Sequence, residues 1–273
     1  MSVSKTKHLL RKCRIVPNKL LGQNFMVAPS IFSKLSDYAS LNKAEDVVLD
    51  AGAGFGFLTR FLADKCRLVI AVEKDPSVAA VLREQLKGFV NVTVIEGDVL
   101  NATVPDFNKV VSIPPYYLSS RLVMWLFDRS FECAVLILQR EFANRMVAAV
   151  GSDAYGWLTV VTYHRAAVEL LDTVPKSMFY PQPEVDSVIA RLTPWNTVPF
   201  EVKDEAFFRR MVRWLFTQRN KKLGNSLVPF IKSTLKMAKA DAEKLACTLP
   251  FREKRARELR PEDFGELANA FIR

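Results

Sequence analysis

The sequence has few of the residues that hold metals or cross-link chains. It contains two histidines and four cysteines in 273 residues, and the cysteines show no paired spacing. Zinc sites and disulfide frameworks depend on such spacing. We therefore predict no metal, and we expect His164, in the apolar run WLTVVTYH, to pack inside the protein. The cysteines are Cys13, Cys66, Cys133 and Cys247.

Long apolar runs are missing too. No stretch approaches the run of about 20 apolar residues that a membrane span needs, and the N-terminus lacks the apolar block of a signal peptide. With 49% hydrophobic and 11% aromatic residues, the chain has enough to build one α/β domain and a smaller second one. We expect a cytoplasmic protein that does not bind a membrane.

Acids are absent from residues 1–22, which carry six Lys/Arg and a net charge of +6. Residues 199–273 carry 17 Lys/Arg against 10 Asp/Glu, a net +7, whereas residues 23–198 carry 16 against 19, a net −3. Basic ends around a nearly neutral middle are typical of a protein that holds a small cofactor centrally and a polyanion at its ends. Solubility alone is the other explanation.

From residue 46 onward, short β-branched runs alternate with amphipathic stretches. The strand-like runs are DVVLD, LVIAVE, VNVTVIEGD, KVVSI and CAVLILQ, followed later by VELLDTV and VDSVIARL. Strands that alternate with helices indicate βαβ units, because a parallel pair needs a long crossover. The sequence therefore predicts an α/β fold with a Rossmann-like, mostly parallel sheet of seven strands.

The segment 193–200, TPWNTVPF, combines two prolines with Asn and Thr and is typical of a linker. Only helical patterns follow it. We therefore expect a basic N-terminal extension at 1–22, a cofactor-binding domain at 23–195 and a small α-helical domain at 199–273.

A glycine-rich turn, residues 51–56 (AGAGFG), follows the first strand. Glycines at such a turn let the backbone approach a ligand closely, so Gly52 and Gly54 are predicted cofactor contacts. A dinucleotide fingerprint requires Gly-x-Gly-x-x-Gly, whereas the third glycine here comes one residue early. An NAD enzyme is therefore disfavoured.

Carboxylates end the next two strands. Glu73 lies 21 residues after Gly52, where an acid can accept both hydroxyls of a ribose, and Asp98 ends the third strand, where it can accept from an adenine amino group. Taken singly, each acid is equally explained as a solvated strand end or a cap. Together with the glycine turn they predict one site at the edge of the sheet. Adenosyl recognition without a pyrophosphate partner indicates S-adenosylmethionine.

The fourth strand runs into Pro114-Pro115-Tyr116-Tyr117. Consecutive prolines fix the backbone and remove N–H donors, so carbonyl oxygens there can accept from an exocyclic amine while Tyr116 stacks on a base. A rigid turn before a helix is the plain alternative.

Eight separated segments resemble the rRNA adenine N6,N6-dimethyltransferases, the KsgA-type small-subunit enzymes, relatives of which include the Erm resistance methylases. The resemblance covers roughly residues 18–265 in order. It implies S-adenosylmethionine-dependent N6-methylation of adenines in small-subunit rRNA, a role in subunit biogenesis, the immature 30S subunit as partner, and a monomer. The segments are LGQNF (21–25), DAGAG (50–54), Glu73, Gly97-Asp98, PPYYLSS (114–120), YGxL (155–158), FYPxPxVDS (179–187) and QRxK (218–221).

The resemblance also implies residue roles. The target adenine is expected between Tyr116 and Phe179, beside Ile113, Pro114 and Pro115, although Phe179 can also be a plain core residue. The implied cofactor contacts are Gln23, Asn24, Phe25, Met26, Gly52, Gly54, Glu73, Lys74, Asp98, Val99 and Ile113. RNA contacts are expected at Arg209, Arg210, Arg213, Arg219, Lys221 and Lys222, in a stretch that holds no acid from Phe207 to Lys239.

Ile113 departs from the family pattern, which has Asn two residues before Pro115. The amide of that Asn accepts from the target amine, and isoleucine cannot. Ser112 is one residue earlier, where strand alternation points it the other way. We therefore expect activity that is retained but slower, or limited to fewer methyl additions.

Three other functions stay open. A DNA adenine methyltransferase uses a similar turn, but the FYPQPEVDS segment and the basic C-terminal helices argue against it. A large-subunit methylase of the Erm type differs only in substrate. A non-catalytic assembly or transcription factor that keeps the fold gains weight from Ile113.

Overall fold

The computed structural model describes residues 3–17 and 22–272, so Leu21 of the LGQNF segment lies outside the described residues. The chain forms two compact units. The first contains Met1–Ala143 and Glu169–Pro194, and the second contains Asn144–Val168 and Trp195–Arg273.

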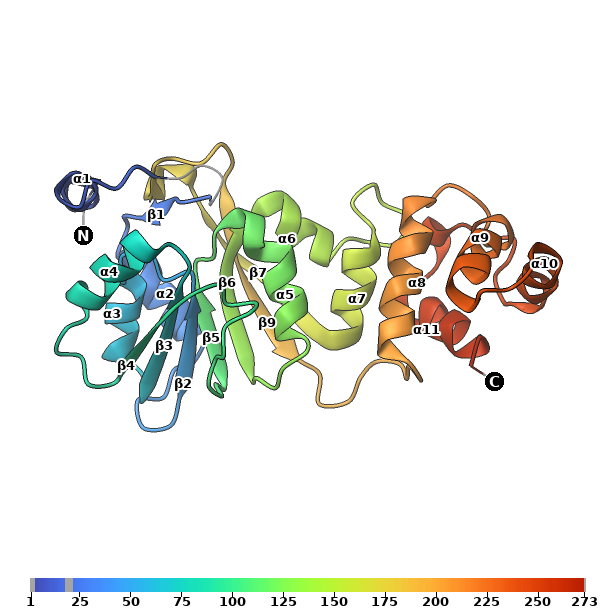
Figure 1. The fold of residues 1–273 in the computed structure, drawn as a ribbon, viewed down its shortest axis with the longest axis horizontal. Helices are drawn as coiled ribbons and strands as arrows, with labels where there is room; N and C mark the ends of the chain where they lie inside the picture. Colours follow the sequence, from blue (N-terminus) through green and yellow to red (C-terminus); the bar gives the residue numbers. More distant parts are fainter. Residues whose placement is uncertain (1–2, 18–21, 273) are drawn as a thin grey trace. The chain divides into compact units, whose positions relative to one another are not determined.

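Seven strands form the sheet of the first unit, in the order β4-β3-β2-β5-β6-β9-β7 (Figure 1). The first five run parallel, and β9 is antiparallel to β6. The predicted fold class is therefore confirmed. The strands are β2 (Val47–Ala51), β3 (Leu68–Glu73), β4 (Val92–Glu96), β5 (Lys109–Ser112), β6 (Cys133–Gln139), β7 (Ala166–Val174) and β9 (Ser187–Pro194).

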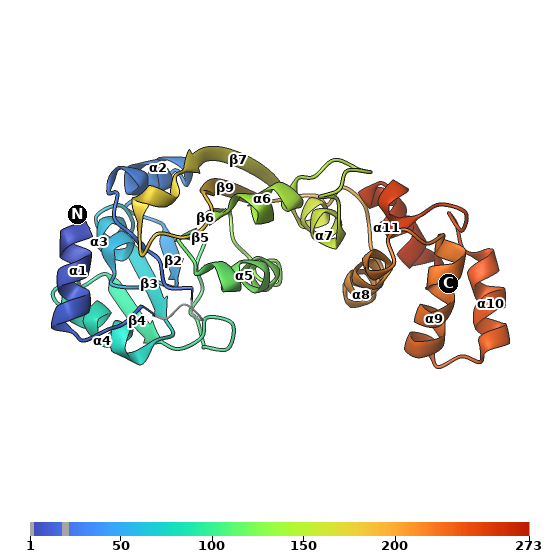
Figure 2. The same cartoon turned by 90° about the horizontal axis from the view of Figure 1, so that it is seen from above.

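Helices cover both faces of this sheet, which is why its central strands are apolar along their whole length. Ile31 and Phe32 of α2 pack with Leu62 of α3 on one face, and α5 lies on the other (Figure 2). All five residues of β2 are buried. The helices of this unit are α1 (Val3–Lys12), α2 (Ser30–Tyr38), α3 (Phe57–Ala63), α4 (Pro76–Gln85), α5 (Ser119–Leu126) and α6 (Arg140–Met146), which ends just beyond it, with 3-10 turns at Tyr116–Leu118 and Lys176–Met178.

A second, two-stranded sheet joins segments that are far apart in sequence. Strands β1 (Phe25–Met26) and β8 (Phe179–Tyr180) pair antiparallel, with Phe25 opposite Tyr180 and Met26 opposite Phe179. This pairing places the segment 22–26 beside the FYPQP segment, over the carboxyl ends of the parallel strands.

The second unit is helical, and it is not continuous in sequence. Residues 144–168 belong to it, not to the cofactor domain in which the boundary 23–195 placed them. The reason is packing, because the buried Tyr155 donates from its hydroxyl to the Leu259 carbonyl at 2.8 Å and His164 packs between Phe200 and Phe208. Its helices are α7 (Trp157–Arg165), α8 (Glu205–Thr217), α9 (Leu223–Leu235), α10 (Lys239–Thr248) and α11 (Pro261–Ala270), with a 3-10 turn at Ala256–Glu258.

The four cysteines are free. In the described part of the chain, no group of three or more His, Cys, Asp or Glu side chains is placed to hold a metal ion. Within the same ranges, no helix has both the length and the apolar character that crossing a membrane requires.

Candidate functional site

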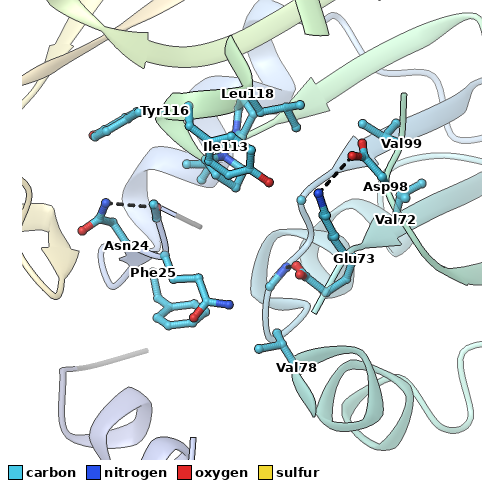
Figure 3. Close-up of a pocket in the computed structure, with 18 of the residues that line it drawn as sticks. Asn24, Phe25, Val72, Glu73, Val78, Asp98, Val99, Ile113, Tyr116 and Leu118 are labelled. Atoms are coloured by element: carbon cyan, nitrogen blue, oxygen red, sulfur yellow. Dashed lines mark hydrogen bonds and ion pairs between the residues drawn. The ribbon is translucent and has the colours of Figure 1, made fainter. Parts of the chain in front are cut away.

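A cavity lies at the carboxyl ends of the parallel strands. Figure 3 shows Glu73 and Asp98 on one side of it and Tyr116 and Asn24 on the other, with Ile113 between them. It brings together every predicted cofactor and catalytic residue except Met26, which lines an adjoining cavity.

The glycine turn, residues 51–56, lines the cavity through Gly52 and Gly54. The backbone of both residues has a positive φ, a conformation that residues with a side chain rarely adopt. Gly52 has φ 82° and Gly54 has φ 57°. A Cβ on Gly52 would lie 2.6 Å from Cδ of Pro115, closer than any real contact. The glycine turn and the proline turn, residues 114–117, therefore touch through a position where only glycine fits.

Glu73 ends β3 and presents a buried carboxylate to the cavity (Figure 3). Its Oε2 accepts from the backbone N–H of Gly54 and its Oε1 from that of Asp75, each at 2.9 Å. Burial raises the pKa of Glu73, and the two backbone hydrogen bonds oppose that rise. Each oxygen keeps a further lone pair for a ligand hydroxyl.

Asp98 lies beside Glu73 at the end of β4. Its Oδ1 accepts from the Leu100 N–H at 3.1 Å, and its Oδ2 pairs with Lys74 Nζ at 3.1 Å. Burial disfavours the charged form, but the Leu100 and Lys74 hydrogen bonds outweigh it, and the pKa of Asp98 is lowered. The buried Val99 follows, so this corner offers one anionic acceptor next to an apolar wall.

Asp50 is a site residue that sequence reasoning missed. It is 1% exposed, accepts from Thr59 Oγ1 at 2.7 Å, and lines the adjoining cavity with Met26. Burial raises the pKa of Asp50 to about 7. The available signal was its place at the end of the first strand, directly before the glycine turn.

The segment 22–26 closes one side of both cavities. The Phe25 ring stacks on Phe55 with centroids 4.3 Å apart, and a Cβ on Gly54 would lie 3.4 Å from the Phe25 ring. Gln23 Nε2 donates to Asp75 Oδ2 at 3.0 Å. Asp75 also caps α4, and its role beside Gln23 was not predicted from the sequence motifs.

The aromatic pair at the other side differs from the expected sandwich. The rings of Tyr116 and Phe179 meet edge to face, 6.4 Å apart at 66°, and Phe179 is 3% exposed within the core that α2 and α3 form with the sheet. Parallel rings on both faces of a base need about 7 Å between their planes, twice the contact distance of about 3.5 Å. In this structure Phe179 is thus a core residue at the cavity wall. Tyr116 is held by Ser187, whose Oγ lies 2.6 Å from the Tyr116 hydroxyl.

The strand alternation predicted at the end of β5 is present. Ser112 is buried and donates from Oγ to the Ala51 carbonyl at 2.7 Å, so it ties β5 to the glycine turn. Ile113 is partly buried and lines both cavities, so the side chain at this point of the site is apolar.

The six predicted RNA-binding cations have different surroundings. Arg219 donates to the backbone carbonyls of Ser152 and Asp153 at 3.1 and 2.9 Å, which gives it a structural role. Arg209 pairs with Glu205, Lys222 with Glu253, and Arg213 stacks over Trp157 at 4.4 Å. Arg210, Arg213, Lys221 and Lys222 are exposed.

The sequence matches known proteins along most of its length. Residues 16–259 match the family model described as ribosomal RNA adenine dimethylase. The chain is 41% identical over 249 residues to the probable ribosomal RNA small subunit methyltransferase A of Methanosarcina acetivorans, an alignment that covers 90% of this chain and 91% of the relative. The ribosomal RNA small subunit methyltransferase A of Halothermothrix orenii is 38% identical over 234 residues, 81% of this chain and 77% of that one.

Solved structures agree with these matches. A dimethyladenosine transferase from Plasmodium falciparum superposes with a TM-score of 0.75 at 28% identity and covers 91% of this chain and 97% of its own. The 23S rRNA methyltransferase ErmE superposes with a TM-score of 0.66 at 28% identity, over 92% and 100%. With the glycine turn, the strand-end acids and the proline turn around one cavity, these matches establish that the chain belongs to the ribosomal RNA adenine dimethylase family.

Proposed function

We propose that the protein transfers methyl groups from S-adenosylmethionine to the N6 amino group of adenines in small-subunit rRNA. One observation carries the proposal. The chain belongs to the rRNA adenine dimethylase family, and one of its cavities has two acids that suit an adenosyl group, Glu73 and Asp98, on one side. The proline turn with the aromatic ring of Tyr116 lies on the other side of the same cavity. The relatives named small subunit methyltransferase A support the choice of subunit.

The residues of the cavity fit this cofactor. The Glu73 carboxylate is held by two backbone N–H groups and retains acceptor capacity for both ribose hydroxyls, while Asp98 and Val99 suit the adenine. Asp50, which lines the adjoining cavity together with Gly52, offers the methionine portion a carboxyl oxygen as a hydrogen-bond acceptor. When bound, the cofactor supplies a methyl group on a positively charged sulfur.

The chain's own contribution to methyl transfer is alignment. The Pro114 carbonyl can accept from the N6–H of the target adenine, which makes the nitrogen a better nucleophile, and Tyr116 can stack on one face of the base. The Ser187 hydrogen bond holds the Tyr116 ring in place before the base enters. The proton that the methyl group replaces on N6 can pass to water after the transfer, so no acid or base side chain is required at the reacting nitrogen, and the apolar Ile113 at this point fits that requirement.

Transfer of labelled methyl to undermethylated 30S subunits and, in a parallel reaction, to large-subunit rRNA, followed by nucleoside analysis, tests the proposal. N6,N6-dimethyladenosine or N6-methyladenosine in small-subunit rRNA supports it. Product only in large-subunit RNA would favour an Erm-type activity, and binding of S-adenosylhomocysteine with no product in either RNA would favour the non-catalytic assembly factor. We further propose that the protein acts in the cytoplasm as a monomer on an immature subunit.

Ile113→Asn is expected to increase the number of methyl groups added per adenine, or the rate of transfer by roughly 10-fold, because it adds an acceptor for the N6–H. Single-turnover transfer to the same subunits measures it. Ile113→Leu, which adds no acceptor, is the matched control. Equal rates for the Asn, Leu and parent proteins would show that the Pro114 carbonyl alone suffices.

RNA binding by the second unit is proposed for its exposed cations rather than for all six predicted ones. Arg210→Glu with Lys221→Glu is expected to weaken RNA binding roughly 10-fold without changing cofactor affinity, because each removes a phosphate contact.

Arg219→Ala is instead expected to lower the melting temperature by several degrees, since two charged hydrogen bonds of about 1.5 kcal/mol each are lost. Thermal unfolding and RNA titration of the variants, with Lys221→Ala as the stability control, separate the two roles. A melting temperature of Arg219→Ala equal to that of Lys221→Ala would contradict the assignment.

A further inference from the structure

Tyr117 is an aromatic side chain that belongs to the cavity wall and is also exposed. It directly follows Tyr116 and lines the same cavity, yet it is 41% exposed to solvent. A Cβ on Gly22 would lie 3.5 Å from Cδ1 of the Tyr117 ring, so the backbone at Gly22 lies against one edge of this ring. The Tyr117 ring is therefore at the mouth of the cavity, where the wall meets the solvent.

Tyr117 differs from the other exposed aromatic side chains in its polar contacts. Tyr163 and Trp195 are exposed to the same degree, 39% and 40%. The Tyr163 hydroxyl donates to Glu262 at 2.7 Å, and Trp195 Nε1 donates to the Tyr163 carbonyl at 2.8 Å. The Tyr117 hydroxyl has no hydrogen-bond partner among the residues that the structure describes. Internal hydrogen bonds thus account for the positions of Tyr163 and Trp195 but not for that of Tyr117.

Arg121 lies one helical turn after Tyr117. The 3-10 turn Tyr116–Leu118 continues directly into α5, which begins at Ser119, so the backbone is helical from Tyr116 onward. Residues four apart are neighbours on the surface of such a helix. Arg121 is exposed, and within residues 3–17 and 22–272 no carboxylate lies at ion-pair distance from it. An exposed cation therefore stands beside the exposed ring.

The charge of Arg121 also acts on the wall of the cavity. Burial raises the pKa of Asp98, but the hydrogen bonds from Leu100 and Lys74 and the charge of Arg121 outweigh burial and lower it. Lys74 pairs with Asp98 at 3.1 Å. Of the two cations that act on Asp98, Lys74 is thus engaged by that carboxylate, and Arg121 keeps its hydrogen-bond donors for another anion.

We propose that Tyr117 and Arg121 form a subsite for the unpaired nucleotide next to the target adenine, whose base stacks on the Tyr117 ring and whose phosphate binds Arg121. The inference rests on the proposed function. An adenine that enters the cavity must leave its own stack, which exposes a face of the neighbouring base at the mouth. An exposed ring with a cation beside it offers both contacts by which proteins bind single strands. Stacking tolerates any base, so the subsite selects an unpaired neighbour rather than a particular base.

The test uses the full chain, undermethylated 30S subunits and saturating S-adenosylhomocysteine, which binds but cannot donate a methyl. The variants are Arg121→Gln, Tyr117→Leu and Tyr117→Phe. The matched control is Arg67→Gln, which neutralises an exposed arginine directly before β3, at the opposite end of that strand from Glu73. Dissociation constants for subunits are measured between about 50 and 200 mM monovalent salt at fixed Mg²⁺. The affinity for S-adenosylhomocysteine alone and the melting temperature are measured for each protein.

The two residues are expected to give different signatures. Arg121→Gln should reduce the slope of log affinity against log salt by about 0.7, the value for one phosphate contact to a single strand, while Arg67→Gln keeps the parent slope. Tyr117→Leu should weaken subunit binding roughly 10-fold at every salt concentration without changing the slope, because a stacked base is lost but no charge. Tyr117→Phe, which keeps the ring, should stay within about twofold of the parent.

Three results would overturn the inference. Equal slopes for Arg121→Gln and Arg67→Gln would remove the phosphate contact. A Tyr117→Phe protein as weak as Tyr117→Leu would assign the effect to the hydroxyl instead of the ring. A Tyr117→Leu protein that loses affinity for S-adenosylhomocysteine, or several degrees of melting temperature, would give the ring a cofactor or structural role.

Failure of the proposed function looks different, because the parent protein would then methylate neither small-subunit nor large-subunit RNA. Methylation by the parent, combined with Tyr117 and Arg121 variants that bind subunits like the Arg67→Gln control, would reject the subsite alone.

Discussion

Glu73→Gln is expected to lower the affinity for S-adenosylhomocysteine about 100-fold. Two hydrogen bonds from ribose hydroxyls to a charged acceptor contribute about 1.5 kcal/mol each, and every 1.4 kcal/mol is tenfold in affinity. The substitution also places an amide NH₂ against one of two backbone donors, the N–H groups of Gly54 and Asp75, which both need an acceptor. Calorimetric titration of the purified protein measures the change.

Glu96→Gln is the matched control for this variant. Glu96 lies opposite Glu73 in the parallel β3–β4 register, but it does not line the cavity, and it pairs with Arg83 at 2.8 Å. Its replacement should leave the affinity within about twofold, because an exposed ion pair contributes little. Similar losses in both variants would mean that general strand-end charge, not the Glu73 carboxylate, attracts the cofactor.

Gly52→Ala is expected to lower the rate of methyl transfer roughly 100-fold and to destabilise the first unit. At φ 82° an L side chain is strained by about 1–2 kcal/mol, and the new Cβ would meet Pro115 Cδ at 2.6 Å. A proline ring cannot rotate away, so overpacking adds about 1–3 kcal/mol. Displacing the glycine turn from the proline turn by about 1 Å should cost roughly 100-fold in rate.

Gly88→Ala separates backbone strain from the contact with Pro115. Gly88 also has a positive φ, 99°, but a Cβ there would meet nothing within 4 Å. Its replacement should lower the melting temperature through strain and leave methyl transfer near the parent rate. If both alanine variants lose activity alike, strain rather than the junction of the two turns controls the site.

Most of the residues that line the cavity could be predicted from the spacing of the motifs, because each motif occupies a short stretch of the chain next to a strand end. Glu73 ends β3 and Asp98 follows the end of β4 by two residues, and parallel strands bring their carboxyl ends to one edge, so the cavity follows from the order of elements. Asp50 was not predicted, because a buried acid at a strand end looks like any other strand residue until its Thr59 partner and its cavity are known. Arg219 was predicted to bind RNA because sequence records its charge but not the carbonyls that it contacts.

The seven-stranded α/β layer and the family could be predicted from the sequence, since hydrophobic period and glycine and proline positions are local properties of the chain. The folded structure alone shows which distant segments meet. It paired Phe25 with Tyr180, placed residues 144–168 with the C-terminal helices, and turned Phe179 edge-on to Tyr116. Such contacts depend on how side chains of separate elements fill a shared volume, and no single segment of the sequence carries that information.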